Sequence, residues 1–270
     1  MIASLTEMAI GLGWLVAIFV PLEWARPAWA SQRRIRKGSA ADLAFMAGQY
    51  LLFGWLVVLC LSWASENVGH PAWLAAVQTR FADQPLAFAA AQAIVLGDLL
   101  MYAGHRLQHR FDFLWRFHAV HHTSERLDFL AAHREHPLDG LYTQTLMNIP
   151  AVALGLPIEQ LLGLVVFRSL WAIFIHSNVR LSLGRLQVLL GGPALHHWHH
   201  ANDRHAGNYA NLAPWIDWIM GTYRCPAAEP QQLGIDGPHP QGYFALLLWP
   251  FLPRRWADRL WPRDKARRAP

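Results

Sequence analysis

Histidines at helical spacing constrain this chain more than any other feature of its sequence. Of its 15 histidines, 13 lie between His105 and His205. Eight of them form three boxes with spacings of three and four residues: His105 and His109; His118, His121 and His122; His196, His199 and His200. Residues three and four apart share one face of a helix, so each box directs its imidazoles toward one point. The sequence therefore predicts helices whose histidines converge on a metal site.

Composition indicates that the chain that carries this site is a membrane protein. Apolar residues make up 54% of the 270 residues and charged residues only 15%, against about 25% charged in soluble domains. The net charge is +5, but the positive residues lie beside apolar runs at 33–37, 106–134 and 254–268. That pattern is typical of a cytoplasmic membrane surface, and it argues against a nucleic-acid partner. Cys60 and Cys225 form neither a disulfide framework nor a CxxC site.

Three apolar segments, 8–24, 43–64 and 86–103, are about long enough to cross a bilayer. The segment 26–41 carries five positive charges and no acid, whereas 66–85 has a single Arg. The positive-inside rule therefore places 26–41 and everything after about residue 104 in the cytoplasm, with the amino terminus and 66–85 outside. The chain is rich in Ala and has 21 Arg against two Lys, which hints at a GC-rich bacterial source. We expect a multi-pass protein of a bacterial inner membrane.

A hairpin is expected over 141–175, which is apolar except for a break at Gly155 and Pro157. Because proline ends a helix, two helices of about 141–154 and 158–175 are predicted to dip into the membrane and return. This return would bring His176 to the earlier histidines. Arg168 is a charge inside this segment and therefore a functional candidate, but its place near a helix end favours a side chain that extends to the membrane surface.

The chain accordingly divides into three regions. Residues 1–103 are predicted to hold the amino-terminal spans, and 104–240 the histidine-box region with its hairpin. Residues 241–270 are predicted to form an interfacial amphipathic anchor and a basic tail. The predicted fold class is all-α, a multi-span helical membrane protein whose cytoplasmic helical cap holds a histidine-rich dimetal site.

The box residues limit the kind of metal site. Eight nitrogens exceed the three or four ligands of one zinc ion and suit two ions with open positions. Imidazole accommodates Fe, Zn, Cu and Ni, so ligand type alone does not choose the metal. The zinc-protease motif HExxH is absent, because Arg106 stands where that motif has glutamate. No carboxylate lies inside a box, so a carboxylate-bridged bundle site does not fit either.

Several motifs in order resemble the fatty acid hydroxylase/sterol desaturase superfamily. They are HRLQH, LWRFHAVHH, HREHP, HSN at 176–178, PALHHWHH, and NY followed by WIDWIMGTY, between Asp98 and about Tyr223. The resemblance implies an integral-membrane, non-haem di-iron enzyme that uses O2 to hydroxylate or desaturate a C–H bond of a lipid such as a fatty acyl chain or sterol. The motifs are shared by hydroxylases, desaturases and an ether-cleaving branch, so they leave the reaction open.

The same resemblance implies a ligand set of ten histidines. It comprises His105, His109, His118, His121, His122, His136, His176, His196, His199 and His200, with His133 as a possible substitute for His136. Ligating imidazoles commonly give their second N–H to a carboxylate or carbonyl, and Asp98 and Asp217 are predicted to support catalysis in that role. Each could instead be a helix cap or a salt-bridge partner.

Cofactors and partners follow from the implied chemistry. Two Fe ions are expected, which Zn can displace in purified material, with O2 as co-substrate and a bilayer lipid as substrate. The sequence has no flavin, haem or iron–sulfur motif, so electrons would come from a separate ferredoxin or cytochrome with its reductase. Two other function classes remain open: a membrane zinc enzyme that hydrolyses a lipid, and a metal-binding or transport protein without catalysis.

Overall fold

The computed structural model describes residues 2–67, 71–156, 158–181 and 183–261, and it is all-helical, with no strand element in those ranges. The α-helices are α1 Ile2–Ala25, α2 Ser39–Gly48, α3 Gly54–Asn67, α4 Ala72–Ala82, α5 Leu86–Arg110, α6 Asp112–His122, α7 Pro137–Ala153, α8 Ile158–His176, α9 Gln187–Leu190, α10 Pro193–His199, α11 Trp215–Ile219, α12 Tyr243–Leu248 and α13 Arg254–Leu260. A π-helix, η1 (Gln49–Phe53), joins α2 to α3, and three short 3-10 turns are η2 (Ala131–His133), η3 (Gly184–Leu186) and η4 (Trp249–Phe251).

Three helical stretches are long and apolar enough to cross a membrane: Leu5–Ala25, Ser39–Trp63 and Leu86–Arg110. They confirm the three spans that the sequence predicts. The third continues further than expected, because α5 stays helical until Phe111 adopts an extended backbone. His105 and His109 therefore lie on the last turns of the span itself.

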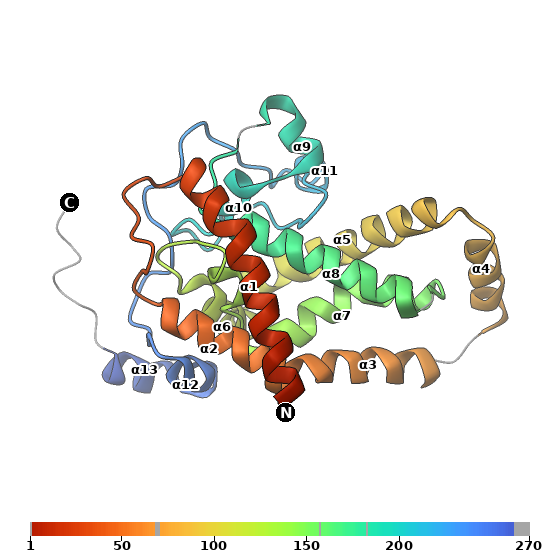
Figure 1. Cartoon of the computed structure of the whole chain (residues 1–270), viewed down its shortest axis with the longest axis horizontal. Helices are drawn as coiled ribbons and strands as arrows, with labels where there is room; N and C mark the ends of the chain where they lie inside the picture. Colours follow the sequence, from red (N-terminus) through yellow and green to blue (C-terminus); the bar gives the residue numbers. More distant parts are fainter. Residues whose placement is uncertain (1, 68–70, 157, 182, 262–270) are drawn as a thin grey trace.

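The expected hairpin is formed by α7 and α8, and a positive φ of 76° at Gly155 helps to turn the chain between them. In Figure 1, α3, α5, α7 and α8 extend together from the histidine region, and α4 lies at their far end. Phe81 of α4, Ala93 of α5 and Leu164 of α8 pack together there. Helix α4 was not expected from the sequence and lies within the segment predicted to be outside.

The expectation that the Arg168 side chain extends to the membrane surface is wrong, because this side chain is buried inside the protein. The residue is only 4% exposed, and its guanidinium donates to the carbonyl oxygens of Met147 in α7 and of Ala93 and Ile94 in α5. Gly97 makes this contact possible, since a Cβ there would meet the Met147 oxygen and the guanidinium. A buried cation thus joins α8 to the backbones of α5 and α7.

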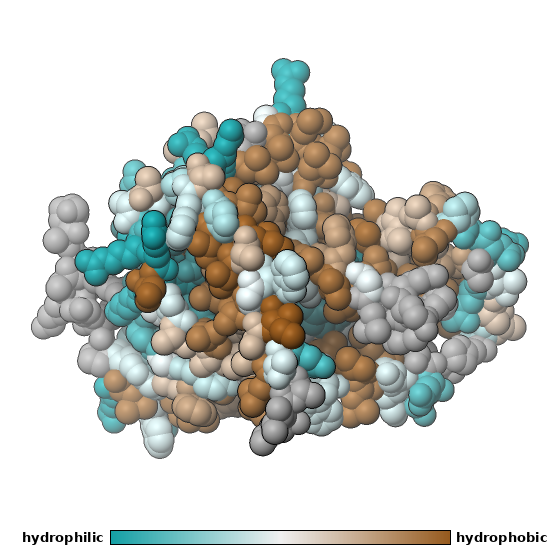
Figure 2. Space-filling view, in the orientation of Figure 1, coloured by the Kyte–Doolittle hydropathy of each residue, from teal (hydrophilic) through white to brown (hydrophobic). Residues whose placement is uncertain are grey.

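Helix α1 crosses the other helices steeply (Figure 1), and its Leu15 and Phe19 pack against Met46, Phe129 and Ile173. Apolar residues cover the middle of this face of the molecule, across α1 and its neighbours (Figure 2). A large apolar outer surface of this kind is typical of a protein surrounded by lipid.

The segment from α12 to α13 exposes large apolar side chains: Phe244, Leu248, Phe251, Trp256 and Leu260. Leu246 faces the other way and is buried against Phe45 and Val120. This arrangement suits the expected interfacial anchor, whereas the predicted basic tail at 262–270 lies outside the described residues. The anchor and the division into three regions remain predictions.

Candidate metal centre

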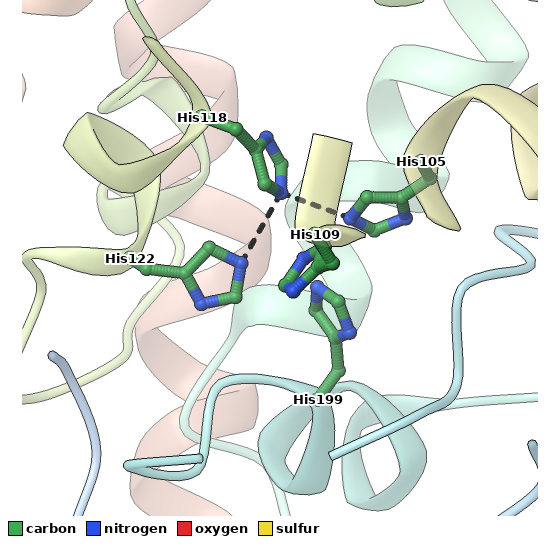
Figure 3. A group of neighbouring side chains, drawn as sticks. All are labelled: His105, His109, His118, His122 and His199. Atoms are coloured by element: carbon green, nitrogen blue, oxygen red, sulfur yellow. Dashed lines mark hydrogen bonds between the residues drawn. The ribbon is translucent and has the colours of Figure 1, made fainter. Parts of the chain in front are cut away.

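Nine histidines gather into two groups at one end of the helical bundle. The first group is His105, His109, His118, His122 and His199, and the second is His121, His176, His196 and His200. Within each group, one ring nitrogen of every member lies within 4.8 Å of those of the others. Figure 3 shows the first group, with its rings turned toward a shared centre.

Helical spacing explains how the chain divides its histidines. On α6, His118 and His122 are four residues apart and enter the first group, while His121 points to the second. The third box divides in the same way, with His199 in the first group and His196 and His200 in the second. The hairpin returns His176 to the second group, where its Nε2 lies 3.0 Å from that of His121.

Backbone carbonyls fix the orientation of most rings. In the first group, the Nδ1–H groups of His105, His109 and His199 donate to the carbonyl oxygens of Tyr209, Arg204 and Gly207, at 2.8, 2.6 and 2.8 Å. In the second group, His121 donates to Arg134 at 3.0 Å, and His176 to Ala172 at 2.6 Å. Since a carbonyl only accepts, each of these rings carries its proton on Nδ1 and a lone pair on Nε2.

The Nε2 atoms then face one another with no proton to share. Those of His105 and His118 are 2.9 Å apart (dashed in Figure 3), and those of His121 and His176 are 3.0 Å apart. The Nε2 atoms of His109 and His199 are buried without a hydrogen-bond partner among the described residues. Converging lone pairs in a buried site repel each other unless a cation lies between them. The donor set therefore fits metal ions, one in each group.

Burial keeps these imidazoles neutral. Loss of water around the rings lowers the pKa of His118 and of His121 to about 3. Burial also lowers the pKa of His122, His196, His199 and His200, and neighbouring imidazoles add to the effect. Neutral imidazole is the form that binds a metal, so the rings are prepared for ligation at neutral pH.

Asp139, which was not among the residues predicted from the sequence, supports one of these rings directly. Its Oδ2 accepts the Nδ1–H of His118 at 2.9 Å, and Oδ1 accepts from the Gln108 amide. This places the lone pair of His118 on Nε2, where the other rings meet. The only sequence signal was its position in the first turn after the HREHP motif, 21 residues from His118.

Asp98 and Asp217 have a different position from the one expected. Asp98 accepts the backbone N–H groups of 211–213, and Asp217 accepts those of Tyr209 and Ala210 and the hydroxyl of Thr222. No hydrogen bond joins either carboxylate to an imidazole in the part of the chain that the structure describes. Both instead shape the loop at 208–213, whose Tyr209 carbonyl oxygen accepts from His105. Their influence on the rings is indirect.

His136 lies outside both groups. Its Nδ1 accepts the backbone N–H of Leu138 at the start of α7, its Nε2 contacts the Leu247 carbonyl oxygen at 3.2 Å, and its ring packs against Phe117 and Phe251. Both ring nitrogens are therefore occupied by backbone, and the ligand set proposed below omits this residue. His133 is also outside both groups, with its Nδ1 3.3 Å from the Gln49 side-chain oxygen.

A buried ion-pair network holds the segment between the second box and α7. The Arg36 guanidinium donates to Asp128 at 2.6 and 2.7 Å and also to Asp42, which in turn accepts from Arg134. Asp42 and Arg36 belong to α2 and to the chain just before it. Since the Arg134 carbonyl oxygen orients His121, this network fixes one ring of the second group.

Comparison with known proteins agrees with the resemblance that the sequence motifs indicate. Residues 90–222 match the model of the family described as fatty acid hydroxylase. The chain is similar to ornithine lipid hydroxylase OlsE of Rhizobium tropici, 34% identical over 62% of this chain and 51% of that protein. It is also similar to human alkylglycerol monooxygenase, 31% identical over 54% of this chain and 32% of that protein. A putative Delta(7)-sterol-C5(6)-desaturase 2 of Arabidopsis thaliana is 30% identical over 50% of this chain and 48% of that protein.

The chain thus spans about a third to a half of the length of these curated relatives. No solved structure matches it. The matched region covers α5 to α11 and contains both histidine groups. Together with the three candidate spans, the match identifies a membrane protein.

Proposed function

We propose that this chain, which belongs to the fatty acid hydroxylase family through residues 90–222, is a membrane enzyme that uses O2 to hydroxylate or desaturate an unactivated C–H bond of a lipid. The observation that carries the proposal is the pair of buried histidine groups whose Nε2 lone pairs converge. The names of the relatives describe hydroxylation, monooxygenation or desaturation of lipids, and all three reactions attack a C–H bond.

Nine histidines would hold two iron ions: His105, His109, His118, His122 and His199 one of them, and His121, His176, His196 and His200 the other. Bound iron would supply activation of O2 and removal of hydrogen from an aliphatic carbon, chemistry for which side chains have no suitable group. Hydroxylation of R–H by O2 releases the second oxygen atom as water and consumes two electrons and two protons. We infer that a separate ferredoxin or cytochrome with its reductase supplies those electrons.

The protein's own residues position the ligands and exclude water. Asp139 and the carbonyl oxygens of Tyr209 and Arg134 each keep one ring, those of His118, His105 and His121, in the tautomer that directs Nε2 inward. Burial of the rings removes water that would compete for the open positions. The carboxylates of Asp98 and Asp217 hold the loop that carries Tyr209, so we assign them a positioning role.

We place the histidine groups at the cytoplasmic face of a bacterial inner membrane. The positively charged stretch 26–41 precedes the second span. Under the positive-inside rule this stretch is cytoplasmic, and the histidine end of α5 lies on the same side of the membrane. A lipid substrate reaches this face directly from the bilayer.

The test combines metal content, oxygen consumption and product mass. The purified, iron-loaded protein with an electron donor is expected to incorporate one atom of 18O from 18O2 into a lipid, or to remove two hydrogens from it. Replacing either His109 or His196 with Ala should reduce the metal bound per chain and abolish turnover. The exposed His205→Ala serves as the matched control, because His205 lies outside both groups. Full activity with zinc and no oxygen uptake would overturn the proposal in favour of a hydrolase.

A further inference from the structure

A cavity of about 550 Å³ lies among α3, α7 and α8. Its size falls within the range of ligand-binding pockets, about 300–1,000 Å³. Most of its wall is apolar, with Val57 from α3, Val152 from α7 and Val165 from α8. Val58 lines it too, and 52% of that residue is exposed. The cavity is therefore open to the surface of the protein along α3, which belongs to one of the candidate spans.

One end of this cavity is polar and contains a carboxyl group that accepts few hydrogen bonds from the protein. Gln49, Glu135, His136 and Gln144 form that end. Thr143 donates its hydroxyl to Oε1 of Glu135 at 3.1 Å, and no other hydrogen bond or ion pair to this carboxyl exists among the described residues. A carboxyl group facing an apolar cavity is costly unless a donor meets it. Glu135 is thus suited to accept a hydrogen bond from a bound molecule.

The backbone around the polar end is shaped to make room for this carboxyl. At Gly140 a Cβ would lie 2.8 Å from Oε2 of Glu135, so a glycine leaves the space that the side chain occupies. The π-helix Gln49–Phe53 forms part of the same wall. Single π turns inside apolar helices occur frequently at functional sites.

The polar end is also the end nearer to the metal centre. Gln49 donates to the carbonyl oxygen of His133 at 3.3 Å, and Glu135 lies four residues before Asp139, whose carboxylate accepts from His118. The opposite end reaches the hairpin turn at Gly155, beside Gln78 of α4. The amide of Gln78 is occupied there, since it donates to the Ala153 carbonyl oxygen at 3.0 Å.

We propose that this cavity binds one acyl chain of an amphiphilic lipid, and that Glu135 accepts a hydrogen bond from an N–H or O–H group at the lipid's polar end. The chain of the lipid then extends between α3, α7 and α8 toward the hairpin turn. The polar end is held toward the histidine groups, so oxidation occurs at carbons close to that end. This last consequence rests on the proposed function, whereas the binding of the lipid does not.

Binding is tested without turnover on the full-length protein in nanodiscs. The probe is a palmitoyl ethanolamide that carries a diazirine in its chain, and its counterpart is the methyl ester of the same acid, which has no N–H or O–H group. Val165→Trp places a bulky indole in the cavity and is expected to reduce photolabelling by the amide at least about tenfold. Val166→Trp is the matched control, because that residue is 59% exposed and does not line the cavity. Equal labelling of the two variants would refute the cavity as the binding site.

Glu135 is tested by its preference between the two probes. The wild-type protein should label with the amide about tenfold more strongly than with the ester, the factor expected for one additional hydrogen bond. Glu135→Leu should abolish this preference, and Glu135→Gln, which keeps an accepting oxygen, should retain part of it. Metal content is measured in each variant, so that a folding defect is recognised. A preference that survives in Glu135→Leu contradicts the assignment.

Tandem mass spectrometry of the oxidised lipid tests the orientation. The added oxygen or the new double bond is expected among the carbons nearest the polar group, and a modification near the methyl end would overturn the orientation. If no oxidised lipid forms but labelling still depends on Val165 and Glu135, the proposed function fails and the binding site stands. If lipid is oxidised but labelling does not depend on these residues, the binding site fails alone.

Discussion

Single side chains determine whether the imidazoles of this protein present lone pairs or protons to the metal centre. His118 depends on a carboxylate for this, while five other rings depend on backbone carbonyls that point mutation does not remove. Asp139 is therefore the orienting group that a substitution can test.

We expect Asp139→Asn to weaken metal binding about 10- to 100-fold, the usual effect of removing a carboxylate behind a ligating histidine. The amide can donate as well as accept, so it no longer fixes the proton of His118 on Nδ1. Metal per chain is measured after dialysis against a graded series of chelator concentrations. Asp258→Asn, on the exposed face of α13, is the control. Identical retention in the two variants would rule out this role.

The lowered pKa values predict how stability depends on pH. In the unfolded chain histidine titrates near 6.5, whereas burial lowers the pKa of His118 and His121 to about 3. Below about pH 6.5 the unfolded chain therefore binds protons at these histidines, whereas the folded protein does not. The free energy of unfolding consequently decreases as the pH falls toward 3. Across this window, each of these histidines lowers the free energy of unfolding by about 1.4 kcal/mol for every unit by which the pH falls.

The measurement is the thermal midpoint of metal-free protein in detergent at pH 7.5 and pH 5.5, and the lower pH should give the lower midpoint. His205→Ala should show the same decrease, because this side chain is exposed. A midpoint that does not change between the two pH values would contradict the prediction.

At the scale of helices, local periodicity was enough to predict much of the structure. Spacings of three and four residues placed the box histidines on shared faces, and the apolar runs gave the three spans and the hairpin. The pairing of Asp139 with His118 was not predictable, because it depends on the path of the chain through 123–136. For the same reason Asp98 and Asp217, which look like ring partners by spacing, bind the backbone of a distant loop instead.

The contact between α5, α7 and α8 yields a prediction about packing. Gly97→Ala would place a methyl group against the Met147 carbonyl oxygen and the Arg168 guanidinium. Overpacking of this kind costs about 1–3 kcal/mol, so the thermal midpoint should fall. Gly163→Ala on α8 is the matched control, since a Cβ there meets no described atom within 4 Å. Equal midpoints for the two variants would show that α5 and α7 can separate without cost.

For the whole molecule, the orientation in the membrane is open to a direct test with a natural cysteine. Cys225 is exposed and follows the third histidine box, whereas Cys60 is partly buried in α3. In a Cys60→Ser background, a membrane-impermeant maleimide should label Cys225 in inverted vesicles but not in intact cells. Labelling in intact cells would place the histidine groups on the outer side.

Two short helices, α6 and α10, each contribute histidines to both groups. An ion captured by one group holds these helices in the arrangement that the other group requires. The two occupancies are consequently cooperative: a limited supply of metal should divide the population into empty molecules and doubly loaded ones. Molecules that carry a single ion should be scarce at every stage of loading.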